Sequence, residues 1–103
     1  LNQDKAGVIR RLIYYYERGD GLFKIKKSPA KVRELLLRSV EFNDPVSMVK
    51  LALQIESEAN NPDRYKQAYA LFEKARKLQY PPAYYYSGVY FENGLSEKQD
   101  NKM

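Results

Sequence analysis

The sequence contains no cysteine, no histidine and no tryptophan among its 103 residues. Without cysteine there is no disulfide, no thiolate nucleophile and no thiolate metal ligand. Without histidine the chain lacks the most common general base and the most common metal ligand. No apolar run approaches the ~20 residues that a membrane-spanning helix needs. These absences argue against an enzyme, a metal site or another cofactor, and they leave the cellular compartment open.

Tyrosine is abundant instead. Ten Tyr and four Phe make the chain 14% aromatic, and hydrophobic residues account for 44% of it. That hydrophobic share is ordinary for a globular chain, so we expect the sequence to fold. A tyrosine ring can pack while its hydroxyl stays wet, which suits binding surfaces as well as core edges. The net charge of +5 favours acidic partners by long-range attraction.

Apolar residues recur at helical spacing in five stretches. The first stretch runs from Val8 to Arg18, and residues 1–5 before it are expected to be frayed. The stripes are, in order, Ile9, Leu12, Ile13 and Tyr16; Val32, Leu35, Leu36, Ser39 and Val40; Met48, Leu51, Ala52 and Ile55; Ala68, Leu71, Phe72, Ala75 and Leu78; and Ala83, Ser87, Tyr90 and Phe91. No stretch shows sustained β alternation. The chain is therefore predicted to be all-α, with five helices of roughly 10–17 residues.

Proline and capping residues mark the ends of these helices. A proline at the first helical position lacks only an amide hydrogen that would be unpaired there. Four prolines stand where a helix is expected to begin: Pro29, Pro45, Pro62 and Pro82. Ser28 and Asp44 are predicted N-caps, and Gly19 is predicted to end the first helix in a left-handed conformation.

The helices also repeat along the chain. A constant step of 36 residues aligns three pairs in the second and fourth helices: Val32 with Ala68, Leu36 with Phe72, and Ser39 with Ala75. Steps of 39 and 36 align Leu12, Leu51 and Ser87 in the other helices. Such a period is typical of a solenoid of helix pairs. We expect a single domain over residues 1–103, cut from a longer array, with repeats at about 8–44, 45–80 and, in part, 81–103. An exposed end repeat would offer a route to self-association.

The last third of the chain carries a specific pattern. It reads Ala68-x-x-Leu71-Phe72-x-Lys74-Ala75, then Ala83-x-x-x-Ser87-Gly88-x-x-Phe91-x-x-Gly94. This pattern resembles the Sel-one-like repeat (SLR), a longer-loop relative of the tetratricopeptide repeat. The earlier copies depart from it, since Ile13 and Ala52 stand where the repeat has its first glycine. The resemblance implies a right-handed α–α superhelix of about two and a half helix-turn-helix repeats. It also implies an adaptor or scaffold that binds a partner protein or peptide on its concave face.

The resemblance also suggests which residues would contact that partner. In the related tetratricopeptide fold, the first helix of each pair lines the concave side. The positions map here to Arg10, Tyr14 and Glu17, to Val49, Leu53 and Glu56, and to Tyr85, Val89 and Glu92. Val49 and Leu53 form an apolar binding patch if they are exposed, or curvature buries them against a neighbouring helix. The three equivalent glutamates form either an acidic rail for a basic peptide or a set of solvated side chains near helix ends.

Two alternative functions have less support. Nucleic-acid binding would use the tyrosine runs 14–16 and 84–86 and a basic block made of Lys24, Lys26, Lys27, Lys31 and Arg33. That block falls mostly in a loop, so a solvated loop is favoured over phosphate contact. A hydrolase would use two carboxylates from Glu56, Glu58 and Asp63, but nothing else in the sequence supports catalysis.

Overall fold

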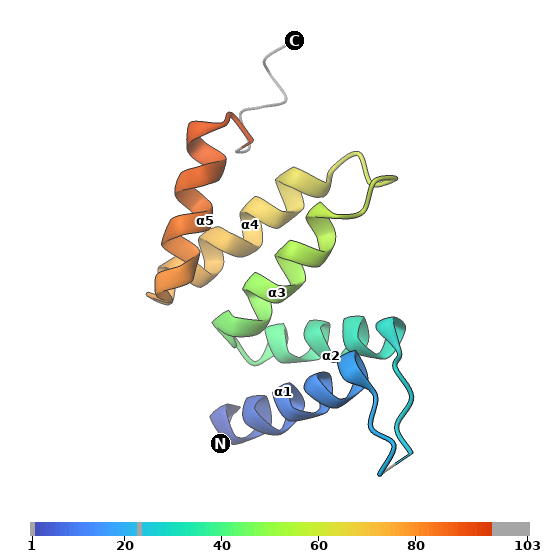
Figure 1. Cartoon of the computed structure of the whole chain (residues 1–103). Helices are drawn as coiled ribbons and strands as arrows, with labels where there is room; N and C mark the ends of the chain where they lie inside the picture. The colour runs from blue at the N-terminus through green and yellow to red at the C-terminus, as the bar shows by residue number, and fades with distance from the viewer. Residues whose placement is uncertain (1, 23, 96–103) are drawn as a thin grey trace.

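The chain folds into five α-helices in the computed structural model, which describes residues 2–22 and 24–95 (Figure 1). The helices are α1 (Asn2–Arg18), α2 (Pro29–Glu41), α3 (Pro45–Glu56), α4 (Arg64–Lys77) and α5 (Pro81–Glu92). Within the described residues there is no strand, and the loop between α1 and α2 is closed by an isolated bridge between Asp20 and Ile25. The prediction of an all-α chain with five helices is confirmed.

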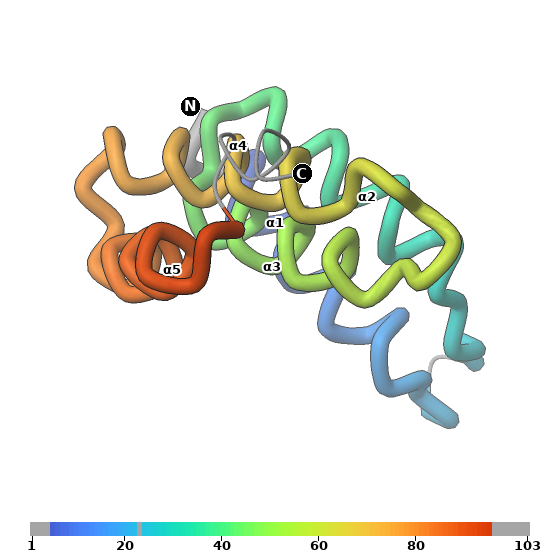
Figure 2. The backbone as a smooth tube through the Cα atoms, turned by 90° about the horizontal axis from the view of Figure 1, so that it is seen from above, coloured from blue at the N-terminus to red at the C-terminus, as the bar shows by residue number. Residues whose placement is uncertain are grey.

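Consecutive helices pack on one another and the pairs stack in one direction. α1 packs against α2 and α3 against α4, while α2 meets α3 and α4 meets α5 (Figure 1). Seen from above, α5 lies at one side of the molecule and the loop between α1 and α2 reaches out at the other (Figure 2). The molecule measures 51 × 32 × 19 Å along its principal axes. This packing of neighbours is consistent with a helical repeat, and the handedness of its superhelix stays a prediction.

Two buried clusters hold the helices together, and α3 contributes to both. The first cluster lies among α1, α2 and α3 and contains Ile9, Ile13, Val32, Leu36, Leu51 and Ile55. The second lies among α3, α4 and α5 and contains Met48, Val49, Ala52, Ala68, Phe72, Ala75, Ala83 and Tyr90. All six residues that the 36-residue step aligns in α2 and α4 are buried, which is what a structural repeat requires.

A tight corner joins α2 to α3. Asn43 follows the last turn of α2 with a positive φ of 60°. The Asp44 amide donates to the Ser39 carbonyl at 3.3 Å and the Asn43 amide to the carbonyl of Val40 at 2.9 Å, which together make a Schellman motif. Pro45 then begins α3 at once. Ser28 and Asp44 accept backbone hydrogen bonds as predicted N-caps, and Gly19 has the predicted positive φ of 78°.

The same corner returns 36 residues later between α4 and α5. Gln79 has a φ of 63°, and the Tyr80 amide donates to the Ala75 carbonyl at 3.2 Å. Pro81 begins the next helix. The chain therefore turns from one repeat into the next by the same backbone geometry on both occasions.

The side chains inside the two corners differ. At the first corner Asp44 is buried and accepts three hydrogen bonds, from the Ser39 hydroxyl at 3.2 Å, the Ser47 hydroxyl at 2.8 Å and the Ser47 amide at 3.3 Å. The Arg10 guanidinium lies 3.7 Å from the same carboxylate. The equivalent hydroxyl positions at the second corner are Ala75 and Ala83. The two serine donors are thus replaced by alanines, and Tyr80, which makes no side-chain capping bond, stands at the position of the buried Asp44.

Three predicted helix starts differ from the structure. α1 begins at Asn2, so residues 2–5 are helical rather than frayed. α4 begins at Arg64 and not at Pro62, because Asn61 forms a turn there, accepting the Asp63 amide with its side chain at 3.0 Å. α5 begins at Pro81, one residue before the predicted Pro82.

Three residues of the predicted stripes are exposed. Leu12 of α1 has an exposed fraction of 38%. Leu78 caps the end of α4 and is exposed. Phe91 has an exposed fraction of 76%, although its equivalent in α3, Ile55, is buried. Ile55 packs in the first cluster with residues of α1 and α2, whereas Phe91 belongs to neither cluster.

Replacing Asp44 with alanine is expected to lower the free energy of unfolding by about 2 kcal/mol, because the buried Ser39 and Ser47 hydroxyls lose their acceptor together with the cap of α3. Urea unfolding followed by circular dichroism measures the change. Asp44→Asn keeps an acceptor oxygen and should cost less than half as much. Equal losses of stability in the two variants would contradict the role of the Asp44 side-chain oxygen as the acceptor for Ser39 and Ser47.

Replacing Gln79 with glycine is expected to raise the stability by about 0.5 kcal/mol, because glycine adopts a positive φ without the steric cost that a side chain carries. The melting temperature should rise by a few degrees. Ala70→Gly on the exposed side of α4 serves as the control and should lower the stability by about 1 kcal/mol. A loss of stability in Gln79→Gly would show that the corner does not strain this residue.

Candidate functional site

The three predicted contact residues of α1 are all exposed. They are Arg10, Tyr14 and Glu17. The Arg18 guanidinium lies 4.5 Å from the centre of the Tyr14 ring, which holds that ring at the surface. Glu17 pairs with Lys50 of α3 at 3.2 Å. This part of the predicted surface is accessible, although Tyr14 contacts a cation of its own helix and Glu17 pairs with a cation of the next repeat.

The predicted apolar patch on α3 does not form. Val49 has an exposed fraction of 7% and belongs to the second buried cluster. Leu53 is half-buried and packs against the same cluster. α3 lies between α2 and α4, so the apolar residues on both of its sides are needed for packing. Of the two interpretations of these residues, burial is the one that the structure bears out for Val49, and Val49 is wrong as a contact residue.

The predicted acidic rail is used inside the chain at two of its three positions. Glu17 pairs with Lys50, so it joins α1 to α3. Glu56 accepts a hydrogen bond from the Tyr90 hydroxyl, so it joins α3 to α5. Burial of Tyr90, together with this carboxylate, raises the pKa of the phenol, and the proton stays on Tyr90. The third glutamate, Glu92, is exposed. Two of the three equivalent glutamates, Glu17 and Glu56, therefore connect successive repeats.

The end of α5 carries an exposed aromatic surface that was only partly predicted. Tyr85 was predicted as a contact residue and has an exposed fraction of 69%. Val89, from the same predicted set, is half-buried. Tyr84 and Phe91 are exposed beside Tyr85, and the open space at Gly88 lies between them along the helix. We call Tyr84, Tyr85, Gly88 and Phe91 the α5 face.

The repeat register explains why the α5 face is open. Thirty-six residues earlier, Met48, Val49 and Ala52 hold the positions of Tyr84, Tyr85 and Gly88, and all three are buried in the cluster that contains α4 residues. Tyr84, Tyr85 and Gly88 of the α5 face therefore lie on the side that a following helix covers in the preceding repeat. The signal that would have found it is the register itself. It places Tyr84, Tyr85 and Gly88 at positions that α4 residues cover one repeat earlier and that no helix covers among the described residues.

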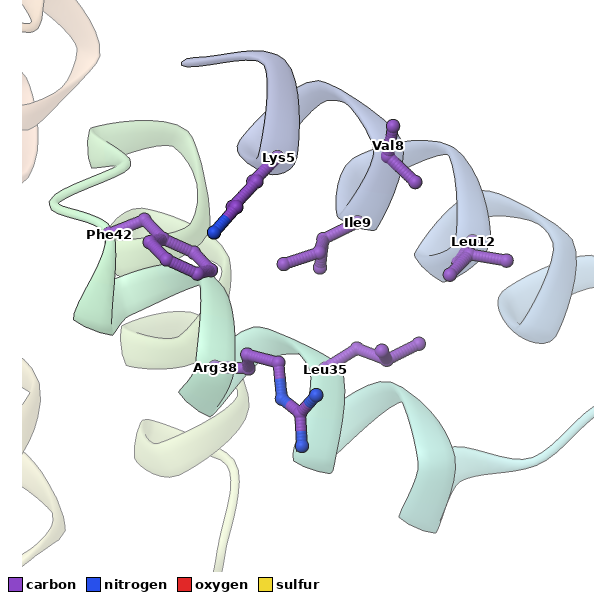
Figure 3. Close-up of a pocket in the computed structure, with 7 residues that line it drawn as sticks. All are labelled: Lys5, Val8, Ile9, Leu12, Leu35, Arg38 and Phe42. Carbon is purple, nitrogen blue, oxygen red and sulfur yellow. The ribbon is translucent and has the colours of Figure 1, made fainter. Parts of the chain in front are cut away.

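A pocket of about 480 Å³ opens between α1 and α2, at the side of this pair away from α3 (Figure 3). Its walls are apolar and come from Val8, Ile9 and Leu12 of α1 and from Leu35 and Phe42 of α2. Two cationic side chains, Lys5 and Arg38, complete the lining. No carboxylate lines it among the side chains that the structure describes, which exclude those of residues 1–4. Sequence analysis did not predict this site, because Leu12 was assigned to the core.

The basic block is partly engaged in the fold. Lys24, Lys26 and Lys27 are exposed in the loop between α1 and α2. Lys31 lies 3.7 Å from Glu34, and the Arg33 guanidinium donates to Glu58 at 2.5 Å. The last contact connects α2 to the loop after α3. The block is therefore not a continuous surface of free cations.

The tyrosine runs each turn one ring toward the core, as their helical spacing predicts. Tyr16 packs against the first cluster, and Tyr86 stacks on Phe72 with 4.8 Å between ring centres. The exposed members are Tyr14 in the first run and Tyr84 and Tyr85 in the second. The two runs do not present matched ladders of exposed rings.

The clustered carboxylates are occupied by structural contacts. Glu56 accepts from Tyr90, and Glu58 accepts from Arg33 and from the Asn61 amide group. These hydrogen bonds, that of Arg33 above all, lower the pKa of Glu58. In residues 2–22 and 24–95 no group of three acidic side chains lies close enough to hold a metal ion.

Comparison of the chain with models of protein families, with curated proteins and with solved structures found no match. None of the helices in the described ranges, 2–22 and 24–95, is long and apolar enough to cross a membrane. The functional argument therefore depends on the surfaces themselves, of which the α5 face and the pocket between α1 and α2 are the most distinctive.

The contact between Arg33 and Glu58 predicts a pH-dependent stability. Because the folded pKa of Glu58 is lowered, its contribution is complete above the unfolded value of 4.5 and is lost as the pH falls from there through the folded pKa. The difference in unfolding free energy between the wild type and Glu58→Gln should therefore be constant above that pH and shrink below it. Urea unfolding across a pH series measures this difference. Arg33→Gln should abolish most of the dependence, and an unchanged dependence in Arg33→Gln would contradict the assigned cause.

Proposed function

We propose that this chain is a protein–protein interaction module, an adaptor or scaffold of the Sel-one-like type without catalytic activity. The helical-repeat packing supports the proposal, because stacked helix pairs present extended surfaces built from many helices. The 36-residue step, seen in both the burial pattern and the corners, supports it further. The partner is a protein or a peptide.

The observation that carries the proposal is the α5 face. Exposed aromatic residues gathered on one side of a helix are typical of binding surfaces, where tyrosine and other aromatic side chains supply much of the binding energy. Tyr84, Tyr85 and Phe91 each expose half or more of their side chain within two turns of the same helix. Scattered single apolar residues need no such explanation.

The remaining predicted contact residues divide according to their accessibility. Tyr14 and Tyr85 keep their proposed role as exposed aromatic contacts on α1 and α5. Arg10 and Glu92 are exposed and keep a role at the edge of such a surface. Glu17, Glu56, Leu53 and Val89 are engaged in contacts or half-buried, so we assign them to the framework that holds the surface.

A role in nucleic-acid binding has less support from the same surfaces. Phosphate contacts need several accessible cations, and base stacking needs aromatic rings beside them. The exposed lysines lie in the loop between α1 and α2, while the α5 face lies at the opposite side of the molecule (Figure 2). The exposed rings and the lysines therefore do not form one strand-binding groove.

Replacing Tyr85 and Phe91 with alanine is expected to weaken partner binding by at least about tenfold, because exposed aromatic residues at the centre of a binding surface dominate its energy. Proximity labelling in cells, followed by affinity measurement with each purified candidate partner, gives the readout. The double variant should fold normally, since both side chains point to solvent, and circular dichroism verifies this.

Leu22→Ala provides the matched control, because Leu22 is as exposed as Phe91 but lies in the loop between α1 and α2. Its partner affinity should stay within about twofold of the wild type. A partner that binds the folded double variant as tightly as the wild type would reject the α5 face as the binding surface.

A further inference from the structure

We propose that the pocket between α1 and α2 is a second docking site, and that it takes an amphipathic helix with an acidic end from another protein. This inference goes beyond the proposed function, because it names a separate surface and the chemistry of its ligand. The walls of the pocket are two helices that contribute residues over about two turns each (Figure 3). With a rise of 1.5 Å per residue, the groove is about 10 Å long, which matches two turns of a docked helix.

The repeat register shows that a helix is the natural occupant. Steps of 39 residues align Val8 with Ser47 and Leu12 with Leu51. Leu51 has an exposed fraction of 3%, because Val32 and Leu36 of α2 lie in the same cluster. Leu12 has an exposed fraction of 38% and Val8 one of 56%. The side of α3 that a helix covers is thus the side of α1 that lies open in this pocket.

The second wall shows the same relation. Leu35 of α2 aligns with Leu71 of α4, which packs against both buried clusters. In the following repeat, the groove between α3 and α4 is therefore filled by side chains of a neighbouring helix. A helix laid into an apolar groove contacts it through residues spaced at i, i+3 or i+4, and i+7.

The charge around the pocket selects an acidic ligand. Residues 1–43 contain ten Lys or Arg and five Asp or Glu, whereas residues 44–103 contain eight of each, so the entire net charge of +5 belongs to residues 1–43. Lys5 and Arg38 line the pocket, and among the side chains that the structure describes no carboxylate does. An acidic segment is attracted to this surface at long range and a basic one is repelled.

The two cations also define an orientation. Lys5 reaches toward the Phe42 ring, 5.6 Å from its centre, and Arg38 stands on the opposite wall at the same half of the pocket (Figure 3). Leu12 and Leu35 lie at the other half and carry no charge. The ligand therefore has its carboxylates at one end and its apolar residues along the rest of one side.

The experiment uses a synthetic helical peptide as the probe. A capped, fluorescein-labelled peptide of about 14 residues carries leucines at i, i+4 and i+7 and glutamates only in its first turn, where the helix dipole also favours them. Fluorescence anisotropy with the folded chain at low ionic strength measures its affinity. A matched peptide with glutamine in place of each glutamate should bind about tenfold more weakly, and added salt should weaken the acidic peptide toward the same level.

Variants of the chain locate the site. Leu12→Glu and Arg38→Glu should each weaken the acidic peptide by at least about tenfold, since one removes apolar contact and the other reverses a cation. Their matched controls are Leu37→Glu and Arg11→Glu, which change exposed residues of the same two helices outside the pocket lining and should stay within about threefold. If Leu12→Glu unfolds, Val8→Glu takes its place, because Val8 is more exposed.

Three results would overturn the proposal. The first is no binding of the acidic peptide to the wild-type chain, and the second is binding that Leu12→Glu and Arg38→Glu leave unchanged. The third is a dimer of the free chain, seen by sedimentation, that Leu12→Glu dissociates, since a second copy would then be the occupant. Tyr85→Ala lies outside the pocket and should leave peptide binding unaltered. If the acidic peptide does not bind, only the pocket proposal is rejected, because the α5 face is tested separately by Tyr85 and Phe91.

Discussion

The corner that leads from the second helix of one repeat into the first helix of the next sets the architecture. A Schellman cap ends the helix, one residue takes a positive φ, and a proline starts the next helix two residues later. Because the same backbone geometry occurs at Asn43 and at Gln79, α3 leaves α2 as α5 leaves α4. With so few residues between the helices, the direction of each new pair is fixed locally, and the packing of the clusters follows from it.

One consequence of the corner is that burial depends on the position of a helix in the stack. α3 has helices on both sides, so Leu51 faces the first cluster and Val49 the second. α1 and α5 have fewer neighbours among the described residues, and each leaves apolar side chains at positions that α3 buries. The two candidate surfaces are therefore parts of a repeated core that no helix of residues 2–22 and 24–95 covers, rather than additions to the fold.

Sequence periodicity was sufficient for the parts of the structure that depend on local physics. The stripes of α2 and α3, the N-caps at Ser28 and Asp44 and the 36-residue step all follow from side-chain spacing and capping chemistry. The sequence-based predictions are wrong where burial of a side chain depends on a neighbouring helix. Val49 and Phe91 could not be assigned correctly, because helical spacing does not reveal whether a second helix covers a side chain. The predicted start of α4 at Pro62 is wrong for a local reason, because the turn formed by Asn61 competes with the helix for the same residues.

The chemistry of the two open surfaces argues against pairing of one copy with the next. The pocket between α1 and α2 is equivalent to the side of α3 that α2 covers one repeat later. Because α2 is the second helix of its pair, the pocket accepts a helix that takes the place of such a second helix. The α5 face belongs to a first helix of a pair, and it requires a second helix of its own. The charges also match poorly. The pocket has two cations, Lys5 and Arg38, and the α5 face is followed by one carboxylate, that of Glu92. The two surfaces are thus not complementary in register, which favours a different protein over another copy of this chain at each of them.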